Sequence, residues 1–304
     1  MKDTTMRSDL DRIGTSPGMS RRSFLWAAGA LPFALTACRR VVTGPSGPTA
    51  ARIPVALQLY SVRNDCKANF DAALEQVAAM GFEGVEFAGY YGYTTNPAGL
   101  AAKLKSLNLK AAGTHVQMNA LRGDALKATI DFHQAIGCRF LIVPGDQAFT
   151  DPEKSKVLAD EMNTVAAALK PLGMATGYHN HVNEFKTDGG KTFWDLFAER
   201  TTKDVILQQD CGWTMAAGQD PAAYIRKYPG RTRTTHFKPT VREGDTGKKA
   251  IFGQDSVDWK PVYDACLTVG GTEWIVLEQE VYPDGKSPMD CTRESLAGLK
   301  RLLA

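Results

Sequence analysis

The sequence predicts a single (β/α)8 barrel, and two observations carry this prediction. From Ile53 onward, short apolar runs alternate eight times with longer segments in which apolar residues recur at spacings of three and four. Eight such units in about 250 residues are what a (β/α)8 barrel requires. An open doubly wound sheet, the alternative, usually has fewer units and a glycine-rich phosphate loop, which this sequence lacks.

The eight strands are apolar runs bounded by turn residues. They are predicted at 55–60, 84–88, 110–116, 140–144, 175–181, 205–210, 232–237 and 274–280.

The segments between them have helical periodicity, as in Phe70, Ala73, Leu74 and Val77. Residues suited to begin helices are Asn96, Asp151 and Ser287, and residues suited to end them are Gly81, Gly137, Gly173 and Gly271.

Composition describes a globular chain with little net charge. It has 304 residues, 43% of them hydrophobic, and a formal net charge of +3. Lys and Arg do not cluster beyond the first forty residues, so nucleic acid is not an expected partner.

The first 51 residues do not fit the barrel pattern. Arg21 and Arg22 precede an apolar stretch at 26–37 that is too short to span a bilayer, which predicts a twin-arginine export signal over 1–37. The letters LTAC at 35–38 resemble a lipobox, so we expect Cys38 to be lipidated and to anchor the exported protein to a membrane facing the periplasm. An ordinary cleaved signal with a chance cysteine is the alternative. Residues 38–51, rich in Gly and Pro, then form a flexible tether, and 52–304 form the barrel.

Polar and ionisable residues gather at the carboxyl ends of the predicted strands. A barrel brings these ends to one mouth, whereas barrel interiors are mostly Val, Ile and Leu. The enrichment therefore predicts a functional site. Its members are Gln58, Tyr60, Glu86, His115, Pro144, His179, His181, Asp210, His236, Lys238, Glu278 and Glu280.

A shared cation accounts for this set better than separate structural roles. Burying several carboxylates and imidazoles without a cation costs several kcal/mol per charge. Asp210, His236 and Glu278 would supply oxygen, nitrogen and oxygen from three consecutive strands, a mixture that suits one divalent Mn, Zn, Fe or Co ion. A fourth ligand should come from the preceding strand, where His179 and His181 face the same side if the strand is extended.

Several stretches resemble the xylose isomerase-like TIM barrel superfamily, which includes sugar phosphate isomerases and epimerases. They are LQLYSVR at 57–63, GVEF at 84–87, GYHNH at 177–181, DCGW at 210–213, THFK at 235–238 and IVLEQE at 275–280. The resemblance implies one divalent ion held by Glu, Asp, His and Glu from strands five to eight. The last three fall on Asp210, His236 and Glu278. The first Glu is replaced by His179, which we expect to be the fourth ligand, with His181 facing the substrate.

This replacement removes one of the two carboxylates that exchange the proton in the superfamily's ketose epimerases. We therefore expect an isomerase or epimerase in which Glu278 is the base, the metal polarises a carbonyl, and Lys238 neutralises a developing alkoxide. Proton transfer at the other face is expected from His115, His181 or Glu86. The candidates for contact with the substrate are Gln58, Tyr60 and Trp213.

A free sugar or sugar derivative is the expected substrate, because no basic phosphate cradle is evident at the strand ends. Two alternatives stay open. One is a lyase or hydrolase that acts on keto-sugars or 3-keto-glycosides by elimination, and the other is a carbohydrate-binding lipoprotein without catalysis.

Overall fold

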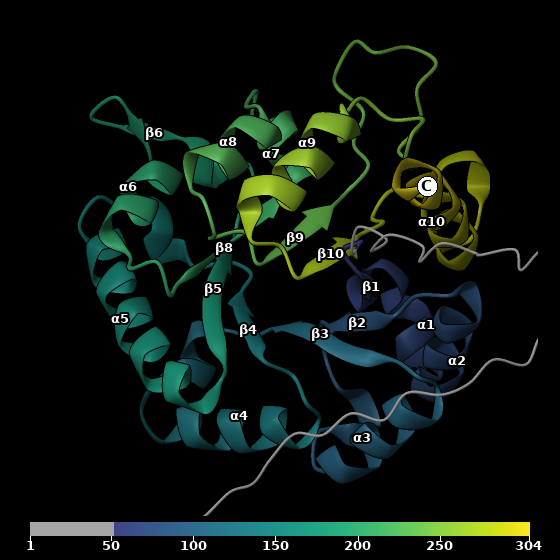
Figure 1. Ribbon diagram of the computed structural model, residues 1–304, viewed down its shortest axis with the longest axis horizontal. Coiled ribbons are helices and arrows are strands. Elements are labelled where there is room, and N and C mark those ends of the chain that lie inside the picture. The colour runs from purple at the N-terminus through teal and green to yellow at the C-terminus, as the bar shows by residue number, and fades with distance from the viewer. Residues whose placement is uncertain (1–51) are drawn as a thin grey trace, which may run out of the picture. The chain divides into compact units, whose positions relative to one another are not determined.

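Eight parallel strands close into a barrel in the computed structural model, which describes residues 52–304 (Figure 1). Their order around the barrel is β1, β10, β9, β8, β5, β4, β3 and β2. The prediction of a closed barrel rather than an open sheet is confirmed. The predicted export signal, the lipidated Cys38 and the tether lie outside the described residues. The barrel strands are β1 (Val55–Gln58), β2 (Gly84–Phe87), β3 (Lys110–His115), β4 (Phe140–Val143), β5 (Ala175–His179), β8 (Ile206–Asp210), β9 (Thr234–Phe237) and β10 (Trp274–Leu277).

Helices surround the strands (Figure 1). They are α1 (Arg63–Ala68), α2 (Phe70–Met80), α3 (Pro97–Ser106), α4 (Gly123–Ala135), α5 (Lys154–Leu169), α6 (Phe193–Arg200), α7 (Cys211–Ala216), α8 (Pro221–Lys227), α9 (Trp259–Ala265) and α10 (Pro288–Leu303). Among the described residues, none of these helices is long and apolar enough to cross a bilayer.

The helix boundaries follow the residues expected to set them. Asn96 Oδ1 accepts from Gly99 N at 2.9 Å at the start of α3, and Ser287 Oγ accepts from Asp290 N at 3.1 Å at the start of α10. Gly81 ends α2 with a φ of 90°, in the left-handed region that glycine adopts without a steric penalty.

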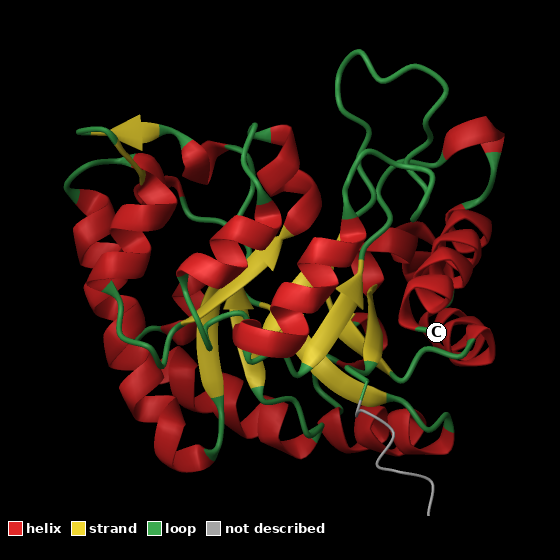
Figure 2. Ribbon diagram, turned by 45° about the horizontal axis from the view of Figure 1, so that its top comes forward, coloured by secondary structure: helices red, strands yellow, loops and turns green. Residues whose placement is uncertain are grey.

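Six strands are shorter than predicted at their carboxyl ends, because polar residues there already bond to the loops, whereas β8 and β9 end as predicted and begin one and two residues later. β1 stops at Gln58, whose Oε1 accepts from Tyr60 N at 3.1 Å, and β5 stops at His179, two residues before His181. A short hairpin that was not predicted, β6 (Thr187–Asp188) and β7 (Lys191–Thr192), turns through Gly189 and Gly190. Figure 2 shows the strand arrowheads directed toward one side, where the long loop between β9 and α9 projects.

Apolar side chains fill the barrel interior except at the carboxyl ends of the strands, where the side chains are polar. On β8, the inward face carries Ile206, Gln208 and Asp210 in succession, so the interior changes from apolar to polar toward the carboxyl ends. The five cysteines of the described residues are all buried and free of disulfides. The core therefore rests on packing, and the polar groups collect at the mouth.

Candidate functional site

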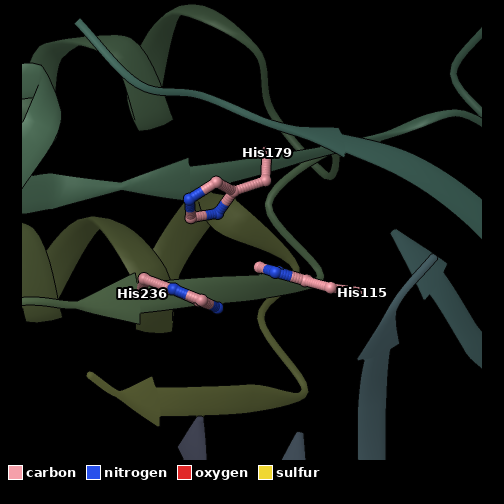
Figure 3. A group of neighbouring side chains, drawn as sticks. All are labelled: His115, His179 and His236. Atoms are coloured by element: carbon pink, nitrogen blue, oxygen red, sulfur yellow. The ribbon is translucent and has the colours of Figure 1, made fainter. Parts of the chain in front are cut away.

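Four ionisable side chains converge at the carboxyl ends of β5, β8, β9 and β10. His179, Asp210, His236 and Glu278 are each at most 4% exposed, and one ligand atom from each lies within 4.8 Å of the others. His115 forms a second group with His179 and His236, and Figure 3 shows these three imidazoles directed toward one another. The structure thus brings together the four residues that the sequence proposed as metal ligands.

The donor set fits a divalent transition metal. Asp210 Oδ1 accepts from Trp213 N at 2.8 Å, but the buried Oδ2 has no hydrogen-bond partner within the described part of the chain. That oxygen lies 3.8 Å from His179 Nε2 and 3.9 Å from His236 Nδ1. A buried carboxylate oxygen without a partner is costly, and a cation among two imidazoles and two carboxylates would satisfy it.

Gln208, which the sequence analysis did not select, determines how His179 presents its nitrogens. Its Nε2 donates to Glu86 Oε1 at 2.7 Å, so its Oε1 must be the acceptor for His179 Nδ1 at 3.0 Å and His115 Nε2 at 2.9 Å. His179 therefore carries its proton on Nδ1 and keeps a lone pair on Nε2, the atom that faces Asp210. The signal in the sequence was a Gln two residues before Asp210, on the inward face of the same strand.

Glu86 holds the other side of His236. Its Oε2 lies 2.5 Å from His236 Nε2 and accepts from Gln58 Nε2 at 2.8 Å, and Gln208 satisfies its second oxygen. Glu86 and Gln58 are fully buried, beneath the cavity described below. A carboxylate on the far nitrogen of a metal-binding histidine fixes the ring and raises its basicity.

Charge coupling shifts the pKa values of the cluster. Burial lowers the pKa of His236, but Glu86 and Glu278 outweigh it and raise this pKa to about 10. Burial raises the pKa of Asp210 to about 7, against the opposing effect of Lys238. Burial also acts to raise the pKa of Glu278, but Lys238 and His236 outweigh it and lower this pKa below its usual range. In the metal-free protein His236 is therefore an imidazolium at neutral pH.

The remaining imidazoles are neutral. Burial lowers the pKa of His115 and His179, and burial together with Lys238 lowers the pKa of His181 to about 4. His181 lies beyond the end of β5, yet its ring centroid is 4.9 Å from that of His179. The two histidines are therefore neighbours as predicted, although the strand that was expected to align them is shorter.

A cavity of about 300 Å³, here called the inner cavity, opens above this cluster. Its lining comprises Tyr60, Ala88, His115, Gln117, Pro144, His179, His181, Lys238, Glu278 and Glu280. Lys238 Nζ pairs with Glu280, lies 3.6 Å from Glu278 Oε2, and is 4.2 Å from the ring centroid of Trp213. Most of the predicted site residues therefore face this space, whereas Trp213 packs behind Lys238.

Comparison with known proteins places this geometry in a family. The family model described as "Xylose isomerase-like TIM barrel" matches residues 74–302. Curated relatives include two named inosose dehydratase. The one from Geobacillus thermodenitrificans is 25% identical, and the one from Lactiplantibacillus plantarum is 24% identical; each match covers 73% of this chain and 85% of the relative.

Solved structures share the fold. A sugar phosphate isomerase/epimerase from Parabacteroides distasonis superposes with a TM-score of 0.71 and 21% identity, covering 84% of this chain and 97% of the other. L-ribulose 3-epimerase gives 0.64 and 15%, covering 83% and 94%. Since the family model spans most of the chain, this protein belongs to the xylose isomerase-like TIM barrel family.

Proposed function

We propose that this protein is a metal-dependent lyase that removes the proton next to a carbonyl group in a carbohydrate and then eliminates the substituent one carbon further on. The observation that carries the proposal is the placement of carboxylates. Among the described residues, the carboxylates that line the inner cavity are Glu278 and Glu280, and both follow β10. Epimerisation by two carboxylates on opposite sides of a substrate needs a carboxylate on the facing side, and the described lining of the cavity has none there.

Neutral imidazoles occupy the facing side. His115 ends β3 and His181 follows β5, and these strands flank β4, which stands opposite β10 in the order of the barrel. The substrate would therefore lie between a charged wall and a neutral wall. This asymmetry supports removal of one proton from one face, the first step of an elimination.

The residues divide the work as follows. A divalent metal held by His179, Asp210, His236 and Glu278 would polarise the carbonyl group. Glu278 is deprotonated at neutral pH and accepts the proton. The ammonium of Lys238, which follows the adjacent strand β9, donates a proton to the departing oxygen. Glu86 and Gln58 position His236 from below, and Tyr60 contacts the substrate at the rim.

The curated relatives support elimination, since a dehydratase removes water. Isomerisation or epimerisation is the second candidate, because His115 and His181 could return a proton from the other side of the cavity. Both reactions begin with the same proton removal, and their products differ.

Deuterium exchange tests the proposal. A panel of keto-sugars incubated with the metal-loaded protein in D₂O should lose the proton next to the carbonyl, as followed by NMR, and give an unsaturated ketone. Glu278→Gln should abolish the reaction, and Lys238→Met should slow elimination by roughly 10²–10⁴, the usual contribution of an acid–base group. Glu75→Gln, on the exposed face of α2, is the matched control and should keep full activity.

The product distinguishes the candidates. An unsaturated ketone establishes elimination, whereas a deuterated isomer establishes isomerisation. If sugars bind but show neither exchange nor turnover, the protein is a carbohydrate-binding protein, and both enzymatic hypotheses are wrong.

A further inference from the structure

A second cavity adjoins the inner one at the mouth of the barrel. This outer cavity, of about 660 Å³, shares Gln117, Pro144 and His181 with the inner cavity. Its other lining residues follow β4 and β5, which are neighbours in the sheet (Figure 1). They are Gly145, Asp146, Gln147, Thr150, Asn183 and Glu184. The inner cavity is at the lower end of the 300–1,000 Å³ typical of small-molecule sites, and the two together approach the upper end.

The outer cavity offers uncharged hydrogen-bonding groups that the protein itself does not use. Across residues 52–304, the side chains of Gln117, Gln147, Thr150 and Asn183 make no hydrogen bond with another protein group. Amides and a hydroxyl supply both donors and acceptors, the combination that sugar hydroxyl groups require. These side chains are therefore available to bind a polyhydroxylated ligand.

The charged residues of the outer cavity are unsuited to binding an anion. Asp146 and Glu184 are the acidic residues of the lining, which contains no Lys or Arg. Asp146 Oδ1 accepts from Ala148 N at 2.9 Å, and Glu184 Oε2 accepts from His181 N at 2.8 Å, so both carboxylates are fixed in the wall. A phosphate group would meet two fixed negative charges and no cation.

We propose that the substrate is a neutral glycoside whose ketone-bearing ring occupies the inner cavity and whose second unit occupies the outer cavity. This inference rests on the proposed function. The position of the ketone follows from the chemistry: elimination breaks the anomeric C1–O bond of the ketone-bearing ring only when the carbonyl is at C3, so that the C2 proton is acidic and the C1–O bond is one carbon further on. Glu278 takes the C2 proton, a C1–C2 double bond forms as the C1–O bond breaks, and the departing oxygen takes a proton from Lys238 to leave as an alcohol.

His181 is the positioning residue at the boundary. It lines both cavities, and its backbone N is held by Glu184. From this place its imidazole can hydrogen-bond the oxygen that links the two units.

Binding of unreactive sugars tests this inference independently of catalysis. Methyl α-glucoside, trehalose, maltose and cellobiose lack the ketone and cannot react, so calorimetry with the metal-loaded protein reports binding alone. We expect at least one disaccharide to bind tenfold or more tightly than methyl α-glucoside, and glucose 1-phosphate to bind more weakly than glucose. Asn183→Ala and Gln147→Ala should remove the preference for the disaccharide and leave the affinity for methyl α-glucoside unchanged. Gln134→Ala, at the opposite end of the barrel, is the matched control.

The contrary outcomes are distinct. Equal binding of methyl α-glucoside and every disaccharide, no measurable disaccharide binding, or tighter binding of glucose 1-phosphate would each overturn the inference. Exchange with a methyl keto-glycoside but no disaccharide preference leaves the proposed function intact. If the disaccharide preference depends on Asn183 but no keto-glycoside shows exchange, the outer cavity is a sugar-binding site and the proposed lyase activity is wrong.

Discussion

Gln208 shows how one amide can set the protonation pattern of a whole site. It donates to Glu86 and accepts from two histidines, so it leaves His179 with a free lone pair and His236 with a carboxylate behind it. In the absence of a metal, the site balances its charge by protonating His236 between Glu86 and Glu278. Binding of a divalent ion must therefore displace protons.

This displacement predicts a pH-dependent stoichiometry. Metal ligands bind in their deprotonated forms, and the free protein holds protons on Asp210, with a pKa of about 7, and on His236, with a pKa of about 10. Binding of Zn²⁺ or Mn²⁺ should therefore release about two protons at about pH 6 and about one at about pH 8.5, and affinity should rise with pH. Calorimetry in buffers of different ionisation enthalpy measures both numbers.

The His236→Ala variant should bind the metal more weakly and release fewer protons on binding it. His133→Ala, which alters a buried histidine of α4, is the control. A proton count that does not change between the two pH values would contradict the protonation scheme.

The metal-ligand candidates could be predicted from the sequence because each one lies at or next to the carboxyl end of a strand, and a barrel brings strand ends together. The functions of Gln208 and Glu86 could not. They depend on a hydrogen bond between residues 122 positions apart, across the interior of the barrel. The strand positions mark both residues as inward-facing, but a sequence with no alignment does not show that they pair with each other.

At the scale of elements, the close approach of β5 and β8 keeps His179 beside Asp210. Gly177 makes this approach possible, because a Cβ at that position would lie 2.4 Å from Ile206 O. Gly177→Ala should force the two strands apart, lower the free energy of unfolding by about 1–3 kcal/mol and weaken metal binding. Urea unfolding of the metal-free and metal-loaded protein measures both effects.

Gly92→Ala is the matched control, because a Cβ there meets no atom within 4 Å. If both alanine variants unfold at the same urea concentration as the wild type, the strand spacing does not depend on Gly177.

The existence and order of the strands were predictable, since apolar runs between turn residues carry a strong local signal. Their ends were not. The predicted strands ran on to Tyr60 and His181, but the chain leaves β1 and β5 where side chains begin to bond to loops. The hairpin of β6 and β7 has only two residues in each strand, too few for an alternation of polar and apolar residues to be recognised in the sequence.

For the whole molecule, the export and anchoring of the chain stay predictions of the first 51 residues. If Cys38 is lipidated, protein isolated from native membranes should begin at Cys38 and carry an acyl mass, and Cys38→Ser should move it to the soluble fraction. Mass spectrometry of the N-terminal peptide measures this directly. Cys66→Ser, which alters a buried thiol of the barrel, is the cysteine control. A mature N-terminus elsewhere, without added mass, would rule out the anchor and leave the barrel unaffected.

The buried thiols have a consequence for where such a chain can fold. Burial raises the pKa of Cys66, Cys138 and Cys266 to about 12, so the folded barrel holds almost no thiolate, the form that attacks disulfides. If residues 52–304 were unfolded, their five thiols would be exposed to an oxidising compartment, where they could join in wrong pairs. If the chain is exported as its first residues predict, folding in a reducing compartment before translocation would avoid this hazard, and a route that accepts folded cargo would allow it.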